Sequence, residues 1–493
     1  MGHMAEAGVR PGTLGDARGW TPFMRTEKES LTMNRRTFLA TSAMGAIGTL
    51  TGCATAQPRG ISPNSKLNHA CIGVGNMGGA DISNFRTHAG TQIVALCDVD
   101  RNHLAKAAAD FPGVRTYTDW RELLAKEGDR IDSVNIAVPD HMHTLIAANA
   151  MRAGKHVYCQ KPLCHDMSEC RLLRNIAKRM NVVTQLGVQF SAGAGDRMAV
   201  EMHKADAVGT VEHVYLFSNR KGRSRIEVTR PEKADPVPAS LDWDLWLGTA
   251  PYRPYAEKVY HPLLWRIWQD FGSAWLGDIG CHLHSSVWKG LGLTAPISAK
   301  AEVQESWKNT PARFKDTWPQ GAHITWIYPG NRKTGGKPLT VEWFDGMTGT
   351  AAANLLPPPE IQALAKEVGL EKLPDEGSVV AGSEGWLLLP HTSGPRLILK
   401  DKAAAKPPKP NLPPWPSHYH EFLNACIEGK RSSADFSLIA PMVEAILLGN
   451  VAERVPDTLL EWDAPDMRIA NVAEANRFLR RTYRKGWELP GLA

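Results

Sequence analysis

The sequence lacks the long basic runs that are typical of nucleic-acid-binding proteins. Its 57 lysines and arginines nearly balance 51 aspartates and glutamates, which leaves a net charge of +6 over 493 residues. Because the cations are spread along the chain, no nucleic-acid partner is predicted. The sequence has no internal repeat, and beyond the N-terminal region no apolar run is long enough to predict a membrane span.

Cysteine is scarce, and its spacing is not that of a metal site. Among eight cysteines, Cys159, Cys164 and Cys170 lack the C-x-x-C spacing of zinc ligands, and no metal is predicted. Cys71, Cys97 and Cys159 lie in apolar, strand-like runs, where a small buried thiol is the usual explanation. Without Cys53 an odd number remains, which favours reduced, core-filling cysteines over a set of disulfides.

The composition is that of a soluble globular protein, and the N-terminus resembles an export signal. Apolar residues make up 43% and charged residues 22%, over a length sufficient for two domains. Arg35 and Arg36 precede a short apolar run over 39–50, the order found in twin-arginine signals, which export folded proteins. An ordinary signal or a buried N-terminal helix is the alternative interpretation.

The N-terminal region divides into three predicted segments. We predict a non-native or mis-assigned extension over 1–32, a twin-arginine signal over 33–56 and a linker over 57–66. Leu50-Thr51-Gly52-Cys53 resembles a lipoprotein cleavage box, which leaves open a lipid on Cys53 as the only membrane attachment. The expected location is therefore periplasmic, or membrane-anchored by lipid.

Strand and helix patterns alternate over residues 67–186. The expected strands cover 70–74, 92–98, 133–138, 156–160 and 182–186, and the expected helices cover 103–111, 120–127, 142–153 and 167–180. This alternation predicts an α/β Rossmann domain with a parallel sheet. Over 187–493, strands without regular intervening helices predict an α+β domain with a large open, mostly antiparallel sheet. Helices are expected near its end, over 419–428, 437–455 and 469–483.

A glycine-rich turn follows the first predicted strand. In Gly73-Val74-Gly75-Asn76-Met77-Gly78 the first glycine permits the tight turn, the second lets the backbone approach a pyrophosphate, and the third lets helix and strand pack closely. Asp98 closes the next strand 20 residues after Gly78, the distance expected for a ribose-binding acid. A carboxylate there favours NAD over NADP, although Arg101 softens the preference.

Three further motifs make the interpretation more specific. Pro139-Asp140-x-x-His143 follows the third predicted strand, where Asp140 alone is explained by an ordinary helix N-cap. Gln160-Lys161-Pro162 and Asp278-x-x-x-His282 lie further along. Together with the glycine turn, these motifs resemble the exported bacterial members of the Gfo/Idh/MocA oxidoreductases, named for glucose–fructose oxidoreductase and inositol dehydrogenase, over residues 67–486.

The resemblance implies a catalytic set of Lys161, Asp278 and His282. In that family the histidine exchanges the substrate hydroxyl proton, the lysine bonds the carbinol and the nicotinamide ribose, and the aspartate orients them. Spacing supports one part independently, because Asp278 and His282 are four residues apart and share a helix face. The family usually has glutamate where this chain has Gln160. The predicted cofactor-binding set is completed by Pro139, Asp140, His143, Gln160, Lys161 and Gln189.

Tryptophan is concentrated before the Asp278 segment. Six of the 16 tryptophans fall between Trp243 and Trp288. Indole rings stack on the apolar faces of sugars, so Tyr260, Trp265 and Arg266 are predicted to bind substrate. Ordinary core packing is the alternative for at least half of these tryptophans.

The predicted function is NAD-dependent oxidation of a hydroxyl on a sugar, glycoside or polyol. Because free NAD is scarce outside the cytoplasm, an exported enzyme is expected to hold its cofactor tightly. One alternative is an NAD-dependent glycosidase that transiently oxidises C3 and eliminates the aglycone; retention of Lys161 favours the dehydrogenase, since the family's glycosidases tend to lose it. The other is a non-catalytic sugar-binding lipoprotein. The resemblance also implies a homo-oligomer, either dimer or tetramer.

Overall fold

The structure of the protein is a computed structural model that describes residues 66–492, except 223 and 405–409. The predicted extension and signal, with Arg35, Arg36 and Cys53, and the linker up to residue 65 lie outside the described residues.

The first sheet is parallel and has six strands in the order β3-β2-β1-β4-β5-β6. Its strands are β1 (Leu67–Ile72), β2 (Thr91–Cys97), β3 (Arg115–Tyr117), β4 (Ser133–Ile136), β5 (His156–Gln160) and β6 (Thr184–Gly187). The helices between them are α2 (Met77–Phe85), α3 (Arg101–Ala108), α4 (Trp120–Glu127), α5 (Asp140–Arg152) and α6 (Met167–Met180). This is the expected Rossmann architecture, and the strand order reverses beside β1, where such sheets bind ligands.

The second sheet is mixed and has nine strands in the order β13-β12-β11-β7-β10-β9-β8-β14-β15. Its strands are β7 (Val211–Ser218), β8 (Ser298–Val303), β9 (Ala322–Tyr328), β10 (Leu339–Phe344), β11 (Glu376–Gly382), β12 (Gly385–Pro390), β13 (Arg396–Leu399), β14 (Leu460–Asp463) and β15 (Arg468–Ile469). Only β7 and β10 pair in parallel, so the expected mostly antiparallel sheet is confirmed.

Most of the remaining helices accompany the second sheet, whereas α13 packs against α2 of the first domain. The remaining helices are α7 (Ala194–Lys204), α8 (Trp243–Leu247), α9 (Ala274–Leu291), α10 (Glu305–Lys308), α11 (Pro311–Asp316), α12 (Pro359–Glu367), α13 (His418–Glu428) and α14 (Phe436–Glu453). Short 3-10 turns are η1 (Gln189–Ala192), η2 (Leu264–Ile267), η3 (Arg332–Thr334), η4 (Ala353–Leu355) and η5 (Ala473–Phe478).

One predicted helix is wrong. Residues 469–483 end β15, form the short turn η5 and continue without regular structure. The Asn476 side chain accepts from the Ile469 N–H at 2.8 Å and donates to the Ile469 carbonyl at 3.0 Å. An asparagine that bonds nearby backbone in this way competes with helix formation. The strand β11 escaped prediction, because glycines near both of its ends weaken the apolar pattern.

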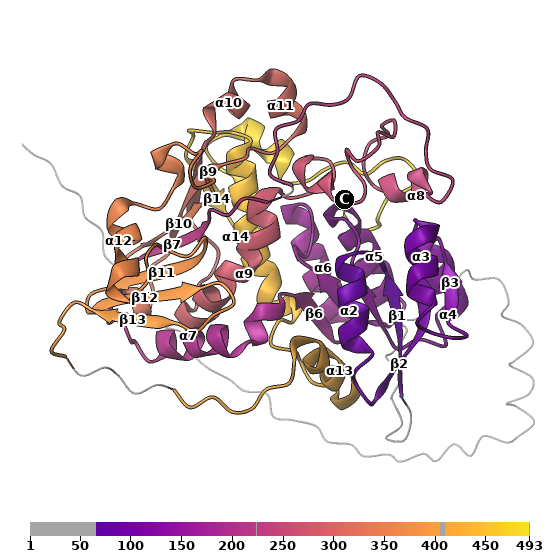
Figure 1. The fold of residues 1–493 in the computed structure, drawn as a ribbon, viewed down its shortest axis with the longest axis horizontal. Helices are drawn as coiled ribbons and strands as arrows, with labels where there is room; N and C mark the ends of the chain where they lie inside the picture. Colours follow the sequence, from indigo (N-terminus) through magenta and orange to yellow (C-terminus); the bar gives the residue numbers. More distant parts are fainter. Residues whose placement is uncertain (1–65, 223, 405–409, 493) are drawn as a thin grey trace, which may run out of the picture. The chain divides into compact units, whose positions relative to one another are not determined.

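Helices α9 and α14 pack against each other, and α14 also packs against α6 of the first sheet and against β8 and β9 of the second (Figure 1). Among the described residues α14 is long and apolar enough to cross a bilayer, with a mean hydropathy of 1.4, but 83% of it is buried inside the protein, as in a core helix. The seven cysteines of the described part of the chain are free and buried. The packing places α9, which carries Asp278 and His282, beside the Rossmann sheet.

Candidate functional site

A cavity of about 530 Å³ lies at the carboxyl ends of the first sheet. The glycine turn forms one side of it. A Cβ on Gly73 would lie 2.5 Å from the Ala137 carbonyl oxygen, and one on Gly78 would lie 2.0 Å from the Gly73 oxygen. The turn therefore has no room for side chains at these positions and presents backbone atoms at the start of α2, where free N–H groups favour a phosphate.

Most predicted cofactor-binding residues line this cavity. They are Gly73, Gly75, Asn76, Met77, Asp98, Pro139, Asp140, Gln160 and Lys161. Gly78 lies behind the turn, where it allows the close packing expected of the third glycine. The Asp98 carboxylate accepts from the N–H groups of Val74 and Asp100, both at 2.9 Å. These bonds hold it at the cavity wall, and the residues present fit a dinucleotide.

A segment from the second half of the chain crosses the end of β2. This segment, residues 239–266, is called the strap below. Arg101 N–H donates to the Ser240 carbonyl at 2.8 Å, and Asp242 N–H donates to the Val99 carbonyl at 2.9 Å. Strap residues line the cavity, namely Leu245, Trp246, His261, Pro262, Leu263, Trp265 and Arg266. The cavity is thus covered by backbone that pairs directly beside Asp98.

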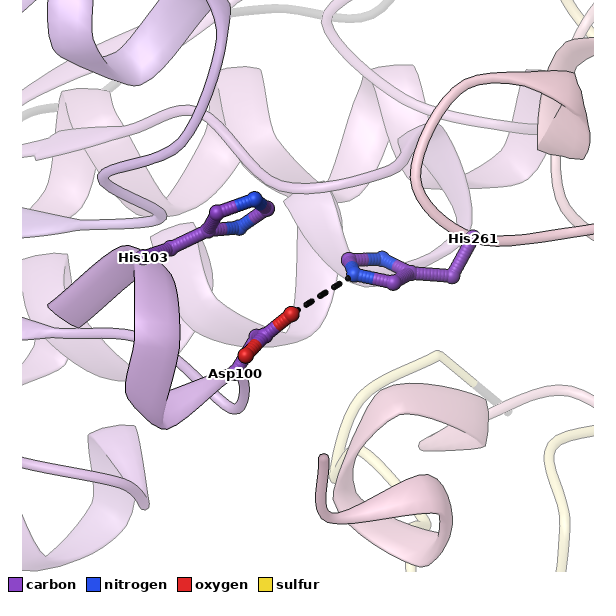
Figure 2. Close-up of side chains that lie close together, drawn as sticks. All are labelled: Asp100, His103 and His261. Carbon is purple, nitrogen blue, oxygen red and sulfur yellow. Dashed lines mark hydrogen bonds and ion pairs between the residues drawn. The ribbon is translucent and has the colours of Figure 1, made fainter. Parts of the chain in front are cut away.

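Figure 2 shows how the strap is attached at its far end, where His261 points toward Asp100 and His103. His261 Nε2 lies 3.1 Å from Asp100 Oδ2, and the two imidazole ring centres are 5.5 Å apart. The three ligand atoms lie within 4.8 Å of one another, so these side chains could also hold a divalent cation. With or without a metal, the cluster ties the strap to the start of α3.

Lys161 and Arg266, which line the cavity, both approach Asp278, which is not among the lining residues. The Lys161 ammonium donates to Asp278 Oδ1, which joins residues 117 apart in the chain. Arg266 Nε lies 3.4 Å from the same oxygen, and its guanidinium lies 4.1 Å from the Trp265 ring centre. Burial would raise the pKa of Asp278, but these two cations hold it well below its usual range, so the carboxylate is ionised.

His282 lies one helical turn after Asp278 on α9 and is buried. Burial, followed by the nearby charge of Lys161, lowers the pKa of His282 well below its usual value. Its Nδ1 has no hydrogen-bond partner among the described residues. That nitrogen is enclosed in the protein, and His282 is not among the residues that line the cavity. A neutral imidazole is able to accept a proton.

The Pro139-Asp140-x-x-His143 motif holds two segments of the site in place, the start of α9 and the Lys161-Pro162 turn. Asp140 accepts from the Ser273 N–H at 3.0 Å, just before α9 begins. His143 Nδ1 lies 2.7 Å from the Pro162 carbonyl oxygen. Burial is the largest influence on both side chains, raising the pKa of Asp140 to about 7 and lowering that of His143 to about 4. His143 is buried behind the cavity wall, so the structure assigns it to the Lys161-Pro162 turn.

Gln160 faces Asp81 on α2. Its amide nitrogen donates to both carboxylate oxygens, at 2.9 and 3.0 Å, and Tyr419 donates to the same carboxylate at 3.1 Å. Burial raises the pKa of Asp81 to about 7, and these donors oppose the rise. Gln160 Oε1 is buried near Gly187 and has no hydrogen-bond partner among the described residues. A glutamate at position 160 would place a second carboxylate against Asp81. This explains why the chain has Gln-Lys-Pro where the family usually has Glu-Lys-Pro.

Gln160→Glu is therefore expected to destabilise the protein by about 1–3 kcal/mol at neutral pH, because it replaces a donor with a second buried acid. A carboxyl group whose pKa is raised on folding makes the folded protein less stable as pH rises from the unfolded pKa to the folded pKa. The loss of stability caused by Gln160→Glu should therefore grow between pH 5 and pH 8. Thermal unfolding at both values measures it. Gln92→Glu, at an exposed glutamine, is the control; equal shifts in the two variants would contradict the role of Asp81.

Some predicted site residues lie elsewhere. Tyr260 is 2% exposed and packs in the aromatic cluster of Trp243, Trp268 and Phe271, because its ring points away from the cavity that the adjacent His261 lines. Trp265 and Arg266 do line the cavity. Gln189 begins η1, and the neighbouring Phe190 contacts the ring of His282, with centres 5.6 Å apart.

Sequence reasoning missed a second imidazole at the site. His391, just after β12, has its ring centre 5.4 Å from that of His282. Its Nδ1 lies 3.2 Å from Glu376 Oε2, and its Nε2 is buried without a partner among the described residues. Although burial opposes it, bonds from His391, Ser218 and Arg220 lower the pKa of Glu376 to about 2. No local pattern marks His391, since it stands alone after a strand.

Comparisons with known proteins agree with this geometry. Residues 67–188 match a family model described as oxidoreductase family, NAD-binding Rossmann fold, and residues 226–328 match the C-terminal alpha/beta domain model of the same family. An inositol dehydrogenase homologue from Azotobacter vinelandii, solved with NADH and myo-inositol, shares the fold with a TM-score of 0.54. It is 17% identical, with 81% of this chain and 98% of that one covered.

Two curated relatives carry glycosidase names. A glycosyl hydrolase family 109 protein of Solibacter usitatus is 29% identical over 208 residues, which cover 39% of this chain and 47% of the relative. An alpha-N-acetylgalactosaminidase of Shewanella oneidensis is 30% identical over 151 residues, covering 29% of this chain and 32% of the relative. The chain spans about half the length, or less, of the curated relatives that it matches.

Proposed function

Because the chain belongs to the Gfo/Idh/MocA oxidoreductase family and has its NAD-binding Rossmann fold, we propose that it oxidises a hydroxyl of a sugar, glycoside or polyol. The observation that carries the proposal is the contact of Lys161, which lines the cavity, with Asp278, one turn from His282. Two cations, one carboxylate and one neutral imidazole meet there, as the dehydrogenation of an alcohol requires.

Each residue of the site has its own role in the proposed reaction. NAD, when bound, supplies the hydride acceptor. His282, whose imidazole is neutral, takes the hydroxyl proton. Lys161 orients the carbinol oxygen while Asp278, held ionised by Lys161 and Arg266, keeps the ammonium in place. Trp265, next to Arg266, offers an apolar face to a sugar ring.

Purification of the protein, release of bound nucleotide and its identification test the cofactor assignment, and a panel of sugars and polyols then tests reduction of that cofactor. NAD in the released fraction and reduction by a sugar support the proposal. A nucleotide-free protein that prefers NADP would overturn it.

A second candidate is a redox-neutral NAD-dependent glycosidase, supported by the names of the curated relatives and by His391. Elimination from a transiently oxidised sugar needs a base for a carbon-bound proton besides the group that serves the hydroxyl. His391, oriented by Glu376 beside His282, supplies such a group. Release of the aglycone from an aryl glycoside without net NADH formation would favour this candidate over the dehydrogenase.

We also propose that the strap retains the cofactor. His261→Ala removes the bond to Asp100, worth about 0.5–1.5 kcal/mol, and should speed NAD release about 2–10-fold. Rapid gel filtration with nucleotide assay measures the release. His213→Ala, which removes a 2.6 Å histidine–carboxylate bond in the second sheet, is the control. Because no metal is predicted, a chelator should leave the rate unchanged; faster release with a chelator would indicate a metal, and equal rates in the two variants would contradict the strap.

We further propose export by the twin-arginine route, with the cofactor bound before transport. Replacing Arg35 and Arg36 with lysine should leave the protein in the cytoplasm, because that pathway requires the paired guanidinium groups. Cell fractionation measures the distribution. Cys53→Ala serves as the control and should change only lipid attachment. Efficient export of the doubly substituted protein would contradict the twin-arginine assignment.

The proposed division into a Rossmann domain over 67–186 and a substrate and oligomerisation domain over 187–493 follows the two sheets. A homo-oligomer through the second sheet is supported by β9, in which half-exposed residues alternate with buried ones, as in a sheet with one face free for a partner. Light scattering of the purified protein distinguishes a monomer from a dimer or tetramer.

A further inference from the structure

A second cavity, of about 690 Å³, shares no lining residue with the first. Its wall comes from the start of α6, from the loop around Asp270 that precedes α9, from α11, from the end of α14 and from residues 477–482. The function proposed above makes no use of it.

The cavity is lined by three arginines whose guanidinium groups are not paired. The side chains of Arg454, Arg477 and Arg480 make no hydrogen bond or ion pair with any described residue. The guanidinium carbons of Arg454 and Arg477 lie 3.8 and 4.5 Å from the centre of the same Phe478 ring. Burial, and then the charge of Arg477, lowers the pKa of Arg454 to about 10, and the nearby Asp270 carboxylate only partly opposes this.

The carboxylates of the cavity wall are already paired with other arginines. Asp166 lies 3.5 Å from Arg481, and Asp316 accepts from Arg230 at 2.7 Å. Asp270 accepts from Arg253. The three free arginines, with Lys315, therefore leave the wall with uncompensated positive charge.

Such a wall is complementary to an oxyanion. Guanidinium groups bind phosphate, sulfate and carboxylate oxygens by charge-assisted hydrogen bonds, which are stronger when water is excluded. Arg454 is partly withdrawn from water and lies beside the exposed Arg477, and two cations in such a position are unfavourable unless an anion joins them. The cavity wall also carries Phe314 and Trp318, against which an apolar ring face can pack.

We propose that this cavity binds a small molecule that bears an oxyanion, whose anionic group is held between Arg454 and Arg477. The oxyanion of this ligand is a phosphate, a sulfate or a carboxylate group. The site is independent of the oxidoreductase site, so its test does not depend on turnover.

Calorimetric titration of the full-length, NAD-saturated protein with inorganic phosphate, sulfate and glucuronate tests the proposal and distinguishes the three anion types. At least one should bind, and more weakly as ionic strength rises. The double substitution Arg454→Gln and Arg477→Gln should weaken binding about 10–100-fold, since each removes a charge-assisted bond. Arg431→Gln, at an exposed arginine elsewhere, should leave it unchanged.

Circular dichroism and thermal unfolding check that the double variant folds, and Arg480→Gln provides a second test at an exposed position. If none of the three anions binds, or if binding is unaffected by the double substitution, the proposal is wrong. If the double variant instead changes the oligomeric state without any effect of the anions, the cavity belongs to a contact between copies and the proposal is equally overturned.

Discussion

His282→Ala and Lys161→Ala should each lower the turnover of any sugar that the wild-type protein oxidises by about 10²–10⁴-fold. His282 is the neutral imidazole beside Asp278. Lys161 has no other described partner than Asp278, and the side chain of Asp278 keeps Arg266 when the lysine is removed. Both variants should therefore fold and retain NAD, because the glycine turn and Asp98 are unchanged.

The measurements are bound NAD, melting temperature and single-turnover reduction of the cofactor. His284→Ala is the matched control, because His284 lies on the same helix, is buried, and has its Nδ1 3.1 Å from the Gly280 carbonyl oxygen. That substitution should lower stability without lowering turnover of the folded protein. Near-wild-type hydride transfer in either test variant would remove the catalytic assignment and favour the sugar-binding lipoprotein.

Gly78→Ala is expected to abolish retention of NAD. The new Cβ would lie 2.0 Å from the Gly73 carbonyl oxygen, a backbone atom that moves only if the turn itself moves. Overpacking of this kind costs about 1–3 kcal/mol, and here it distorts the N–H groups expected to bind the pyrophosphate. The purified variant should contain little nucleotide and should melt at a lower temperature than the wild type.

The adjacent glycine supplies a close control. A Cβ on Gly79 would have its nearest neighbour, the Val74 oxygen, at 3.4 Å, an ordinary contact. Gly79→Ala should therefore keep NAD and gain about 0.5–1 kcal/mol of helix stability. If Gly78→Ala retained NAD as well as Gly79→Ala does, the glycine turn would not be the pyrophosphate site.

The local parts of this protein followed from the sequence by itself. The glycine turn and Asp98 are recognisable because each depends on a few neighbouring residues and on the strand before them. The shared face of Asp278 and His282 follows from the period of the helix. The helices over 120–127 and 167–180 and the strand over 156–160 begin and end where their apolar patterns predict.

Tertiary packing decided the rest. Lys161 meets Asp278 only because α9 begins against Asp140 at the end of the Rossmann sheet, a contact between distant segments that no local period encodes. The orientation of Tyr260 into an aromatic cluster, the approach of His391 to His282, and the lack of counter-ions for Arg454 and Arg477 depend on which segments become neighbours after folding. Periodicity reports the faces of single elements, whereas charge pairing and burial are properties of the packed chain.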